Sequence, residues 1–356
     1  YNFIDGVVQP DPHLLLEPQR TNSLPESENF STNWVAIDAT LSSGISSPDG
    51  GTNAYSLIEG TGTGGKIIYD TISVSAGSVT YSLFMKKGDK RYTALLLSGV
   101  VTTSMFNVDL ENGTGTTVTG SFDSTNIEEY PNGWYRISVT ATATAGNLNC
   151  NVYLMNGSTY NDRNYTGNGT DKTFIFGAQL EAGSLTSYIP TNGSAVTRTI
   201  DTCNIPNYAN LPTDYPITVY WKGQVKEFNG FNCAFSIYKD GTSGEFLVVS
   251  FNTSSQILVR RAVGGDEDVN FISHSYSIGD VLKIGIKFTS ATTFKLFIDG
   301  LEIYEETSGE SKTWDFNSVL IGQLRVAADT GNRNPCDELM VFNEALTDSE
   351  LQTLTT

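Results

Sequence analysis

The stretch FGAQLEAGSLTSYIPT, residues 176–191, carries one carboxylate, that of Glu181, from an apolar run into a Gly-Ser turn. A carboxylate in this position can serve as a catalytic acid, as a ligand of a calcium ion, or as the polar end of a strand. These roles require different neighbours, because glycoside hydrolysis uses a pair of carboxylates and calcium takes several oxygen ligands. The elements around Glu181 must therefore decide its role.

Two further groups of carboxylates could serve a glycosidase. Sandwich glycosidases place two or three carboxylates at alternate positions of one strand, so that they face the same groove. The candidate groups are Asp266, Glu267 and Asp268 in GGDEDVN, and Glu302, Glu305 and Glu306 in LEIYEE. The first group is consecutive and is predicted to lie in a turn, while the second has two adjacent carboxylates and the wrong alternation. We interpret both groups as solvated charge.

The sequence offers little for nucleophilic catalysis. A Ser or Cys nucleophile needs a positioned base, usually His, but the chain has only His13 and His274 and no Gly-x-Ser-x-Gly elbow. The four cysteines, Cys150, Cys203, Cys233 and Cys336, are widely spaced, and two histidines do not complete a zinc site with them. We interpret the thiols as free and mostly buried, with three disulfide pairings left open. A polysaccharide lyase that uses Tyr, Arg and an acid also stays open.

A long polar loop, MNGSTYNDRNYTGNGTDK at residues 155–172, has the residue types that bind sugars. Sugar recognition combines an aromatic ring, which stacks on the apolar face of a pyranose, with polar groups that bond its hydroxyls. The candidate residues are Tyr160, Asn161, Asp162, Arg163, Asn164 and Tyr165, with Trp314 of SKTWDFN as a further surface aromatic. Because most loops between strands are short, this one is interpreted as a glycan contact, an inter-subunit contact or a plain exposed loop.

A second polar segment, ADTGNRNPCDEL, could bind calcium. Calcium requires hard oxygen ligands, which Asp329, Asn332, Asn334 and Asp337 would supply. The alternative is an Asx-rich turn capped by its own side chains. Calcium is therefore the one cofactor that the sequence suggests.

Composition and charge narrow the class of protein. Hydrophobic residues make up 39% and charged residues 17%, with 34 Gly, which suits many short strands joined by polar turns. The net charge is −18 and is spread evenly along the chain, so a phosphate backbone or an anionic lipid surface would be repelled. No apolar run is long enough for a membrane span. We therefore expect neither nucleic acid nor membrane as a partner.

The first half of the chain shows the spacing of a β-sandwich. Alternating runs separated by Gly, Asn, Asp and Ser occur at 66–74, 78–87, 92–99, 104–113, 134–143, 149–155 and 172–181. In YSLFMKK, Tyr81, Leu83 and Met85 are predicted to face a core, with Ser82 and Lys86 facing water. Residues 1–24, with three prolines, are predicted to be an extended linker, and the sandwich is predicted over 25–200.

The second half repeats the pattern after a predicted linker at 201–212. Runs at 217–225, 233–239, 245–252, 256–262, 281–288, 293–298, 301–306, 318–324 and 337–343 predict a second sandwich over 213–356. Asp299-Gly300 predicts a type I′ hairpin, because both residues tolerate positive φ. Thr347 and Glu350 fit a capping box for one short C-terminal helix. The predicted fold class is thus all-β, with two antiparallel sandwiches in tandem.

Several motifs resemble known families. LLLEPQRTN, ENFSTNW, NGWYRISVT and FGAQLEAGSLTSYIPT with AVTR, which together span residues 14–203, resemble a module of bacteriophage head and tail fibres or spikes. The fold of that module is similar to jelly-roll carbohydrate-binding modules. FKLFIDGLEIYEE and DELMVFNEALTDSELQTL resemble the central hairpin and the final strand and helix of laminin-G-like or concanavalin-like lectins. In this resemblance Glu181 ends the closing strand of the first module.

The resemblance implies a virion surface protein without catalytic activity, which is assembled in the bacterial host and binds host or environmental polysaccharide. It also implies other virion proteins as partners, and a homo-oligomer. Two alternatives stay open: a carbohydrate-active enzyme or its substrate-binding portion, and a purely structural capsid or tail component. Because the chain begins at Tyr1 and has no signal-like segment, we expect it to be part of a longer protein.

Overall fold

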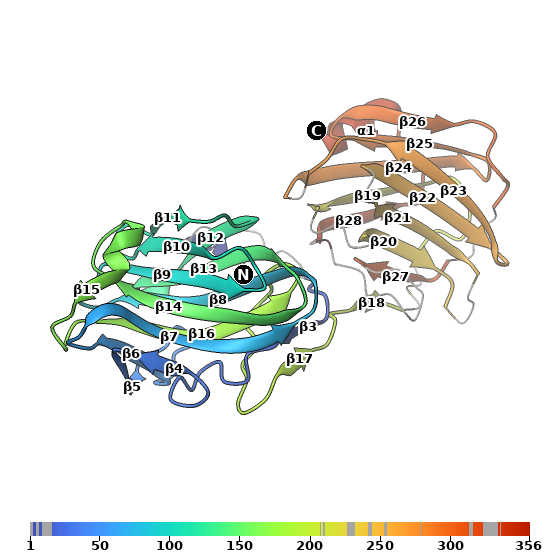
Figure 1. The fold of residues 1–356 in the computed structure, drawn as a ribbon. Helices are drawn as coiled ribbons and strands as arrows, with labels where there is room; N and C mark the ends of the chain where they lie inside the picture. The colour runs from blue at the N-terminus through green and yellow to red at the C-terminus, as the bar shows by residue number, and fades with distance from the viewer. Residues whose placement is uncertain are drawn as a thin grey trace. The chain divides into compact units, whose positions relative to one another are not determined.

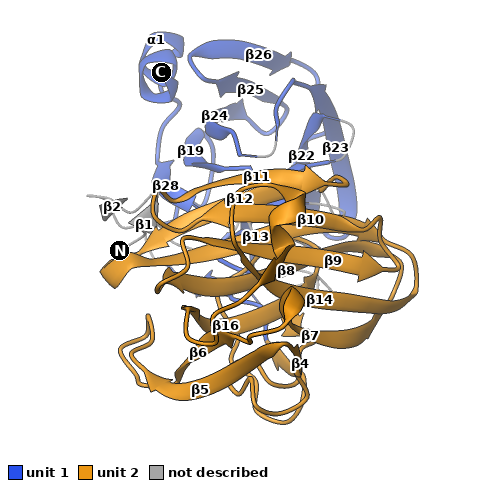
Figure 2. Cartoon of the chain, turned by 60° about the vertical axis from the view of Figure 1, so that its left-hand side comes forward, with its two compact units in different colours: residues 1–2, 10–19, 199–356 blue, residues 3–9, 20–198 orange. Residues whose placement is uncertain are grey.

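A computed structural model describes residues 3–4, 7–8, 16–206, 208, 211–225, 232–240, 244–252, 255–277, 279–312, 316–322, 334 and 336–356. The chain forms two compact units, shown in Figure 2. One unit, called the N-terminal sandwich below, consists of residues 3–9 and 20–198. The other, called the C-terminal sandwich, consists of residues 1–2, 10–19 and 199–356.

The N-terminal sandwich stacks a seven-stranded and a six-stranded antiparallel sheet (Figure 1). The seven-stranded sheet has the order β11 (Thr114–Thr119), β10 (Ser104–Asp109), β9 (Tyr92–Gly99), β14 (Gly146–Met155), β7 (Thr63–Val74) and β15 (Asn164–Thr166), with β4 (Val35–Ile37) also paired to β7. The six-stranded sheet has the order β12 (Ser124–Tyr130), β13 (Trp134–Ala143), β8 (Gly77–Lys87), β16 (Lys172–Ala182), β6 (Ala54–Glu59) and β5 (Ala39–Ile45). Two short pairs accompany them: β1 (Phe3–Ile4) with β2 (Val7–Val8), and β3 (Arg20–Asn22) with β17 (Val196–Arg198).

The alternation of side chains along β8 builds the core between the two sheets. Tyr81, Leu83 and Met85 are fully buried in it, as predicted. Ser82 was predicted to face water but is also fully buried, and this part of the prediction is wrong. The reason is that the outer side of β8 is covered as well, since Phe84 belongs to a second buried cluster with Trp134 and Phe176. The six-stranded sheet is therefore packed on both faces near its centre.

The C-terminal sandwich also consists of two antiparallel sheets. The six-stranded sheet has the order β18 (Cys203–Ile205), β27 (Ser318–Ile321), β20 (Asn232–Tyr238), β21 (Phe246–Phe251), β22 (Gln256–Val263) and β23 (Asp266–Ser273). The five-stranded sheet has the order β26 (Leu301–Glu306), β25 (Thr293–Ile298), β24 (Val281–Ser290), β19 (Ile217–Gln224) and β28 (Cys336–Phe342). Their facing apolar side chains, including the fully buried Trp221, form the core.

The local signals of the second half are present in the structure. Asp299 and Gly300 have φ of 47° and 80° and join β25 to β26. The helix α1 (Asp348–Thr355) begins at Thr347, whose hydroxyl oxygen accepts a hydrogen bond from Glu350 N (3.2 Å) while Glu350 Oε2 accepts one from Thr347 N (2.9 Å). The predicted all-β class with one short C-terminal helix is confirmed for the described part of the chain. None of the helices described there is long and apolar enough to cross a lipid bilayer.

The segments predicted as linkers contain strands and core residues. Leu16 is buried in the core of the C-terminal sandwich, whereas Leu24 is buried in that of the N-terminal sandwich. Between them, β3 pairs with β17. The predicted linker 201–212 likewise contains β18, which pairs with β27. Strands of three residues are too short to show a period of two, so no periodic pattern predicts them.

Candidate ligand-binding surface

The outer face of the seven-stranded sheet carries aromatic and aliphatic side chains from strands far apart in the sequence. Ile68 of β7 and Val152 of β14 point into the core, so their neighbours Ile67, Tyr69 and Tyr153 point outward. Tyr153 lies directly opposite Ile67. The pairing of β4 with β7 adds two more exposed residues, because it sets Val35 opposite Tyr69 and Ile37 opposite Ile67. We call this group, together with Tyr160 and Arg163 of the loop that follows β14, the tyrosine surface.

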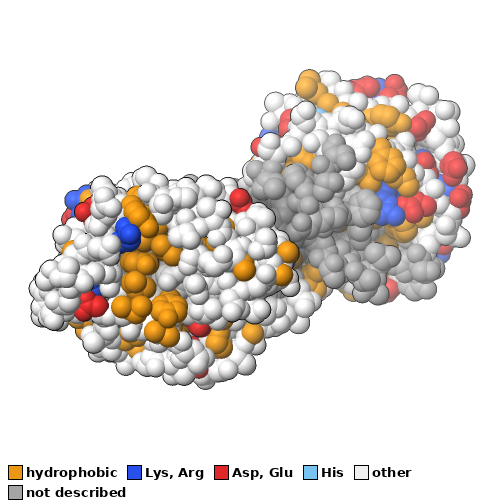
Figure 3. All heavy atoms as spheres, viewed as in Figure 1, with side chains coloured by type: hydrophobic (Ala, Val, Ile, Leu, Met, Phe, Trp, Pro, Cys, Tyr) orange, Lys and Arg blue, Asp and Glu red, His pale blue; other side chains and the backbone are white. Residues whose placement is uncertain are grey.

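The tyrosine surface is accessible to a ligand. Val35 is 46% exposed and Ile37 is 47% exposed, while Ile67, Tyr69 and Tyr153 are partly exposed. Figure 3 shows hydrophobic side chains forming a band across the face of the N-terminal sandwich that is turned toward the viewer. Aromatic rings at a partly exposed site provide a flat apolar area without a large entropic cost of ordering.

A short 3₁₀ helix, η2 (Tyr160–Arg163), lies over one end of this face. Tyr160 packs with Tyr153 and Tyr92 against the buried Met155 and Leu96. The guanidinium of Arg163 stacks on the Tyr160 ring at 3.5 Å from its centroid, and its Nη1 donates to Tyr160 O (2.7 Å). The loop is fixed to the sheet by Asn107, whose amide donates to Gly157 O (3.0 Å).

Tyr153 lies close to both members of the Tyr160 and Arg163 pair. Burial raises the pKa of the Tyr153 hydroxyl, the positive charge of Arg163 lowers it, and Tyr160 raises it. Burial is the largest of these effects, so the pKa of Tyr153 lies above its ordinary value. Tyr153 and Tyr160 pack against the same buried cluster, and Arg163 stacks on Tyr160. Two phenol groups and one guanidinium therefore converge at this end of the tyrosine surface.

Amide side chains follow the same face along β14. Asn151 Nδ2 donates to Leu96 O (3.0 Å), and Asn149 Oδ1 accepts from Thr71 Oγ1 (2.7 Å). Asn151 Nδ2 also donates to Asn149 O (3.2 Å), and Asn149 Nδ2 donates to Ser98 Oγ (3.4 Å). A primary amide has two donor hydrogens, so of these two residues Asn149 keeps one for a ligand, whereas both of those of the buried Asn151 are used. The face thus combines apolar rings with amides, which is the composition of a carbohydrate platform.

A buried polar network anchors the loop that contains η2. Glu59 is 2% exposed; one carboxylate oxygen accepts from Lys90 (2.7 Å) and Tyr165 Oη (2.7 Å), and the other accepts from Asn168 N (2.7 Å). Lys66, which is fully buried, donates to Tyr165 O (2.8 Å) and to Asp38 Oδ2 (2.6 Å). The loop is therefore bonded to β6 and β7, and this bonding keeps η2 in place over the sheet.

The structure separates the loop residues that the sequence grouped together. Tyr160 and Arg163 belong to the tyrosine surface, and Asn161 is exposed beside them. Asp162 accepts from Thr159 N (2.8 Å) and Thr159 Oγ1 (2.7 Å), so it stabilises η2. Tyr165 is bonded to Glu59, and its ring lies 4.4 Å from Lys90 Nζ and 4.8 Å from Lys66 Nζ. Its place in the anchoring network makes it a structural residue here.

Sequence reasoning missed Val35, Ile37, Ile67, Tyr69 and Tyr153. Each lies in a segment that the sequence interprets only as a strand or leaves without assignment. Alternation along β7 and β14 shows that one set of residues faces outward, but it does not show which strands lie side by side. Only the pairing of β4, β7 and β14 brings these residues together.

Glu181 ends strand β16 and is 1% exposed. Its carboxylate accepts a hydrogen bond from Thr186 N (3.1 Å) and another from the Thr186 hydroxyl. It therefore holds the turn that follows β16, as the polar end of a closing strand. This local bonding fits the third of the roles considered for Glu181.

The predicted calcium ligands lie only partly within the described residues. Asp329 and Asn332, like Trp314 of the predicted glycan contacts, fall outside them. Asn334 is fully buried and donates from Nδ2 to Cys233 O (3.2 Å), and Asp337 lies 3.7 Å from Lys222 Nζ. Among the residues that the structure describes, no group of three or more His, Cys, Asp or Glu side chains is placed to hold a metal ion.

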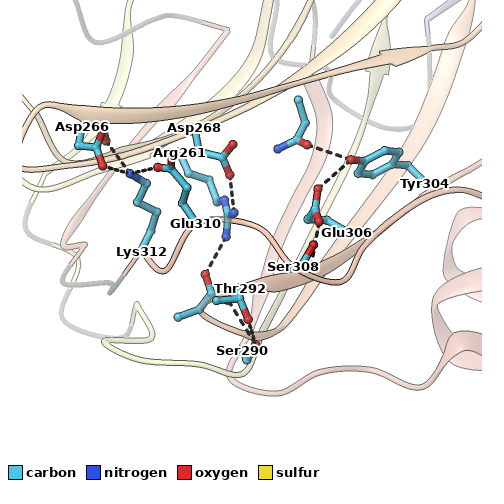
Figure 4. A network of polar contacts seen from close by, with 12 residues as sticks. Arg261, Asp266, Asp268, Ser290, Thr292, Tyr304, Glu306, Ser308, Glu310 and Lys312 are labelled. Carbon is cyan, nitrogen blue, oxygen red and sulfur yellow. Dashed lines mark hydrogen bonds and ion pairs between the residues drawn. The ribbon is translucent and has the colours of Figure 1, made fainter.

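Several candidate carboxylates of the C-terminal sandwich are paired with basic or hydroxyl groups, as Figure 4 shows for one network. Asp268 accepts from the buried Arg261 (2.6 Å), and Asp266 accepts from Lys312 (2.6 Å). These two residues lie in strand β23, so the predicted turn at 266–268 is wrong. The strand was missed because its first three residues are charged, which is typical of an edge strand.

The other carboxylate group is engaged in the same way. Glu302 and Glu305 lie 3.0 Å and 3.5 Å from Lys295 Nζ. Glu306 accepts from Tyr304 Oη (3.0 Å) and Ser308 N (2.9 Å). The Tyr304 hydroxyl also lies 3.0 Å from Asn270 Oδ1. These contacts tie the edge strands β23 and β26 together.

The thiols and histidine complete the list of candidate chemical groups. None of the four cysteines, all of which the structure describes, forms a disulfide bond, and Cys150, Cys233 and Cys336 are buried. Burial raises the pKa of the Cys150 thiol, and the charge of Asp70 raises it further. His274 contacts Tyr276 with ring centroids 6.5 Å apart.

Comparison of the sequence with protein-family models and with curated proteins finds no match. Solved structures with a similar fold include the carbohydrate-binding module CBM40 of the Ruminococcus gnavus IT-sialidase (13% identity, TM-score 0.35), which matches 41% of this chain and 84% of that one. The NanB sialidase of Streptococcus pneumoniae (16% identity, TM-score 0.35) matches 43% of this chain and 27% of that one. A heptameric pentraxin of Limulus polyphemus (13% identity, TM-score 0.34) matches 41% of this chain and 72% of that one. Matches at this identity and TM-score do not identify a ligand for this chain.

Proposed function

We propose that this chain is a non-enzymatic glycan-binding protein of a bacteriophage particle, and that the tyrosine surface is its polysaccharide-binding face. The observation that carries the proposal is the convergence of Tyr153, Tyr160 and Arg163 beside partly exposed aliphatic side chains. A pyranose ring has C–H bonds on its face and hydroxyl groups at its rim. Tyrosine rings match the face, while the guanidinium and the amides of β14 match the rim.

The absence of hydrolysis is part of this proposal. The carboxylates that could have formed a glycosidase pair in the C-terminal sandwich accept from Arg261, Lys312 and Lys295. A general acid must be protonated near neutral pH, which requires an environment that raises its pKa. Lys312 instead lowers the pKa of Asp266. This arrangement supports structural ion pairs over acid catalysis.

The place on the virion rests on the motifs at residues 14–203, which resemble phage fibre and spike modules. As part of the proposal, the chain is attached to other virion proteins, projects from the particle surface and forms a homo-oligomer. Weak binding of one sugar surface would then be strengthened by the many copies on one particle.

The proposal is tested by affinity gel electrophoresis in gels that contain bacterial or algal polysaccharides, with a parallel assay for shortened oligosaccharides. We expect retardation by at least one polysaccharide without release of product. Tyr153→Ala should weaken binding about tenfold, as for a central aromatic contact. Tyr208→Ala is the matched control, because Tyr208 is 48% exposed in the C-terminal sandwich. Melting curves of both variants control for folding.

Each other result has a defined meaning. Oligosaccharide release would refute the non-enzymatic role. Equal binding by Tyr153→Ala and wild type would move the glycan site away from the tyrosine surface. Absence of retardation by the whole panel would favour a structural component of the capsid or tail.

Calcium binding at the segment that contains Asp329, Asn332, Asn334 and Asp337 is a separate proposal. Calcium that binds only the folded chain raises the melting temperature. We expect millimolar calcium to raise it and a chelator to reverse the effect. An unchanged melting temperature would reject the site.

A further inference from the structure

The tyrosine surface contains a cation without an acidic partner. Arg163 makes no ion pair among the described residues, and the structure records only its stacking on Tyr160 and its bond to Tyr160 O. Five other cations of the N-terminal sandwich are bound by carboxylates, namely Lys66, Lys87, Lys90, Arg91 and Lys172. Lys86 and Arg136, like Arg163, make no ion pair among the described residues, but the Arg136 guanidinium is buried and bonded to Ser82 Oγ (3.3 Å). In a chain with net charge −18, most cations find a carboxylate nearby. An uncompensated guanidinium on a candidate binding face is therefore informative.

The nearest carboxylate in the sequence does not neutralise Arg163. Asp162 is bonded to Thr159 through both the backbone N–H and the hydroxyl, and these bonds lower the pKa of Asp162. It therefore stays ionised but is held toward the start of η2. The guanidinium keeps donor groups that are not used by Tyr160 O, because it has five N–H donors in a fixed planar fork.

The position of Arg163 favours a ligand group over solvent alone. Its stacking on Tyr160 restricts the side chain before any ligand binds, which lowers the entropic cost of forming new hydrogen bonds. Tyr153 lies close enough for the charge of Arg163 to lower its pKa. A sugar stacked on Tyr153 would place its rim substituents beside the guanidinium, which covers the neighbouring Tyr160 ring.

From these observations we infer that the polysaccharide bound by the tyrosine surface is a uronic-acid polymer, whose carboxylate pairs with Arg163 while the sugar ring lies on Tyr153, beside the Tyr160 ring that Arg163 covers. A planar carboxylate matches the guanidinium fork by two parallel hydrogen bonds. This inference rests on the proposed function and specifies the class of ligand. It makes Arg163 the residue that distinguishes acidic from neutral polymers.

The test measures binding to two uronic-acid polymers, polygalacturonate and alginate. Binding to each is compared with binding to the same polymer after methyl esterification of its carboxyl groups. Wild-type protein should bind the ester about tenfold more weakly, in line with the strength of hydrogen bonds to charged groups. Arg163→Gln should bind the acid about tenfold more weakly than wild type and should no longer distinguish acid from ester. Arg163→Lys, which keeps the charge but loses the fork, should lie between them.

Lys283→Gln is the charge-matched control. Lys283 lies on β24 of the C-terminal sandwich, and its side chain makes no ion pair among the described residues. Its removal changes the net charge by the same amount and should leave binding unchanged. Equal loss in both variants would mean that only net charge acts, and the inference would fail.

The remaining outcomes separate the inference from the function on which it rests. Equal binding of acid and ester by wild type, with loss of both in Tyr153→Ala, would overturn the uronic-acid assignment and keep the glycan surface. Unchanged acid binding by Arg163→Gln would do the same. Absence of binding to every polymer in either form would overturn both.

Discussion

Replacement of Glu59 by Gln tests whether the buried network holds the loop of the tyrosine surface. Gln keeps the shape but offers one acceptor oxygen where the carboxylate has two. Lys90, Tyr165 and Asn168 all donate to Glu59, so one donor would face the new amide hydrogens. Lys90, only 7% exposed, would also lose its main counter-charge. The other carboxylate near Lys90 Nζ is that of Asp171, and its distance of 3.8 Å is longer than the 2.7 Å to Glu59.

The expected loss follows from these contacts. An unsatisfied buried donor costs roughly 1–3 kcal/mol, and breaking a buried ion pair by removing one partner costs about 3–5 kcal/mol. Glu59→Gln should therefore lower the free energy of unfolding of the N-terminal sandwich by about 3–5 kcal/mol. Lys172→Gln is the control, because its ion pair with Asp89 is largely exposed and should contribute under about 1 kcal/mol.

The effect should depend on pH in a defined direction. Burial by itself raises the pKa of Glu59, but the bonds from Lys90, Asn168 and Tyr165 outweigh it and leave the pKa below its ordinary value. A depressed folded-state pKa stabilises the protein above the unfolded-state pKa of about 4.3. This stability is lost as pH falls through the folded-state value. The difference between wild type and Glu59→Gln should be full above about pH 5 and shrink in more acidic solution.

Urea unfolding at pH 7 and at acidic pH measures these differences, with the transition of the C-terminal sandwich as an internal reference. A second variant, Lys90→Met in the Glu59→Gln background, should recover part of the loss because it removes the unpaired buried charge. A loss below about 1 kcal/mol for Glu59→Gln, similar to the exposed control, would refute the view that this carboxylate holds the loop.

Three further predictions concern the rest of the chain. Leu351→Ala should lower the free energy of unfolding of the C-terminal sandwich, measured in urea, by about 2–5 kcal/mol. Leu351 of α1 is fully buried and packs so closely on Gly285 that a side chain there would meet it. A negligible change would mean that the helix adds little to the core. A thiol reagent at pH 8 should modify Cys150 and Cys336 only after unfolding, because burial raises both thiol pKa values, that of Cys336 to about 12, and rapid modification of either in the native protein would contradict this. Uronic-acid binding should strengthen as the salt concentration rises from about 0.01 M to about 0.15 M. The net charge of −18 repels the anionic polymer, and salt shortens the range of this repulsion from about 30 Å to about 8 Å. Steady weakening of binding with salt would contradict this prediction.

Strong local signals predicted much of the fold. Runs such as 78–87 and 134–143 alternate in polarity and became β8 and β13 with almost the same bounds. Two of the strands that were missed, β11 and β12, are short, polar and largely exposed. Without a buried face they show no apolar alternation, so only pairing with a neighbouring strand defines them.

The candidate site was predictable only in part. Tyr160 and Arg163 were identified because they lie in a conspicuously long polar loop. Tyr165 has the same residue types around it, yet its hydroxyl turns inward to Glu59. Composition does not distinguish an exposed tyrosine from one that anchors a loop, since the direction of each side chain is set by the backbone that carries it.

Local sequence patterns predicted the elements that depend on nearby residues: the alternating strands, the Asp299-Gly300 turn and the capped helix at Thr347. These features depend on periodicity, backbone conformation and bonds a few residues apart. The tertiary structure alone decided which strands lie side by side, and thereby brought Val35, Tyr69 and Tyr153 onto one face. It also decided that Glu59 meets Lys90 and that Arg163 meets no acidic side chain among the residues that the structure describes. Such contacts arise from the pairing register of distant strands, and a shift by one residue would turn every outward side chain into the core.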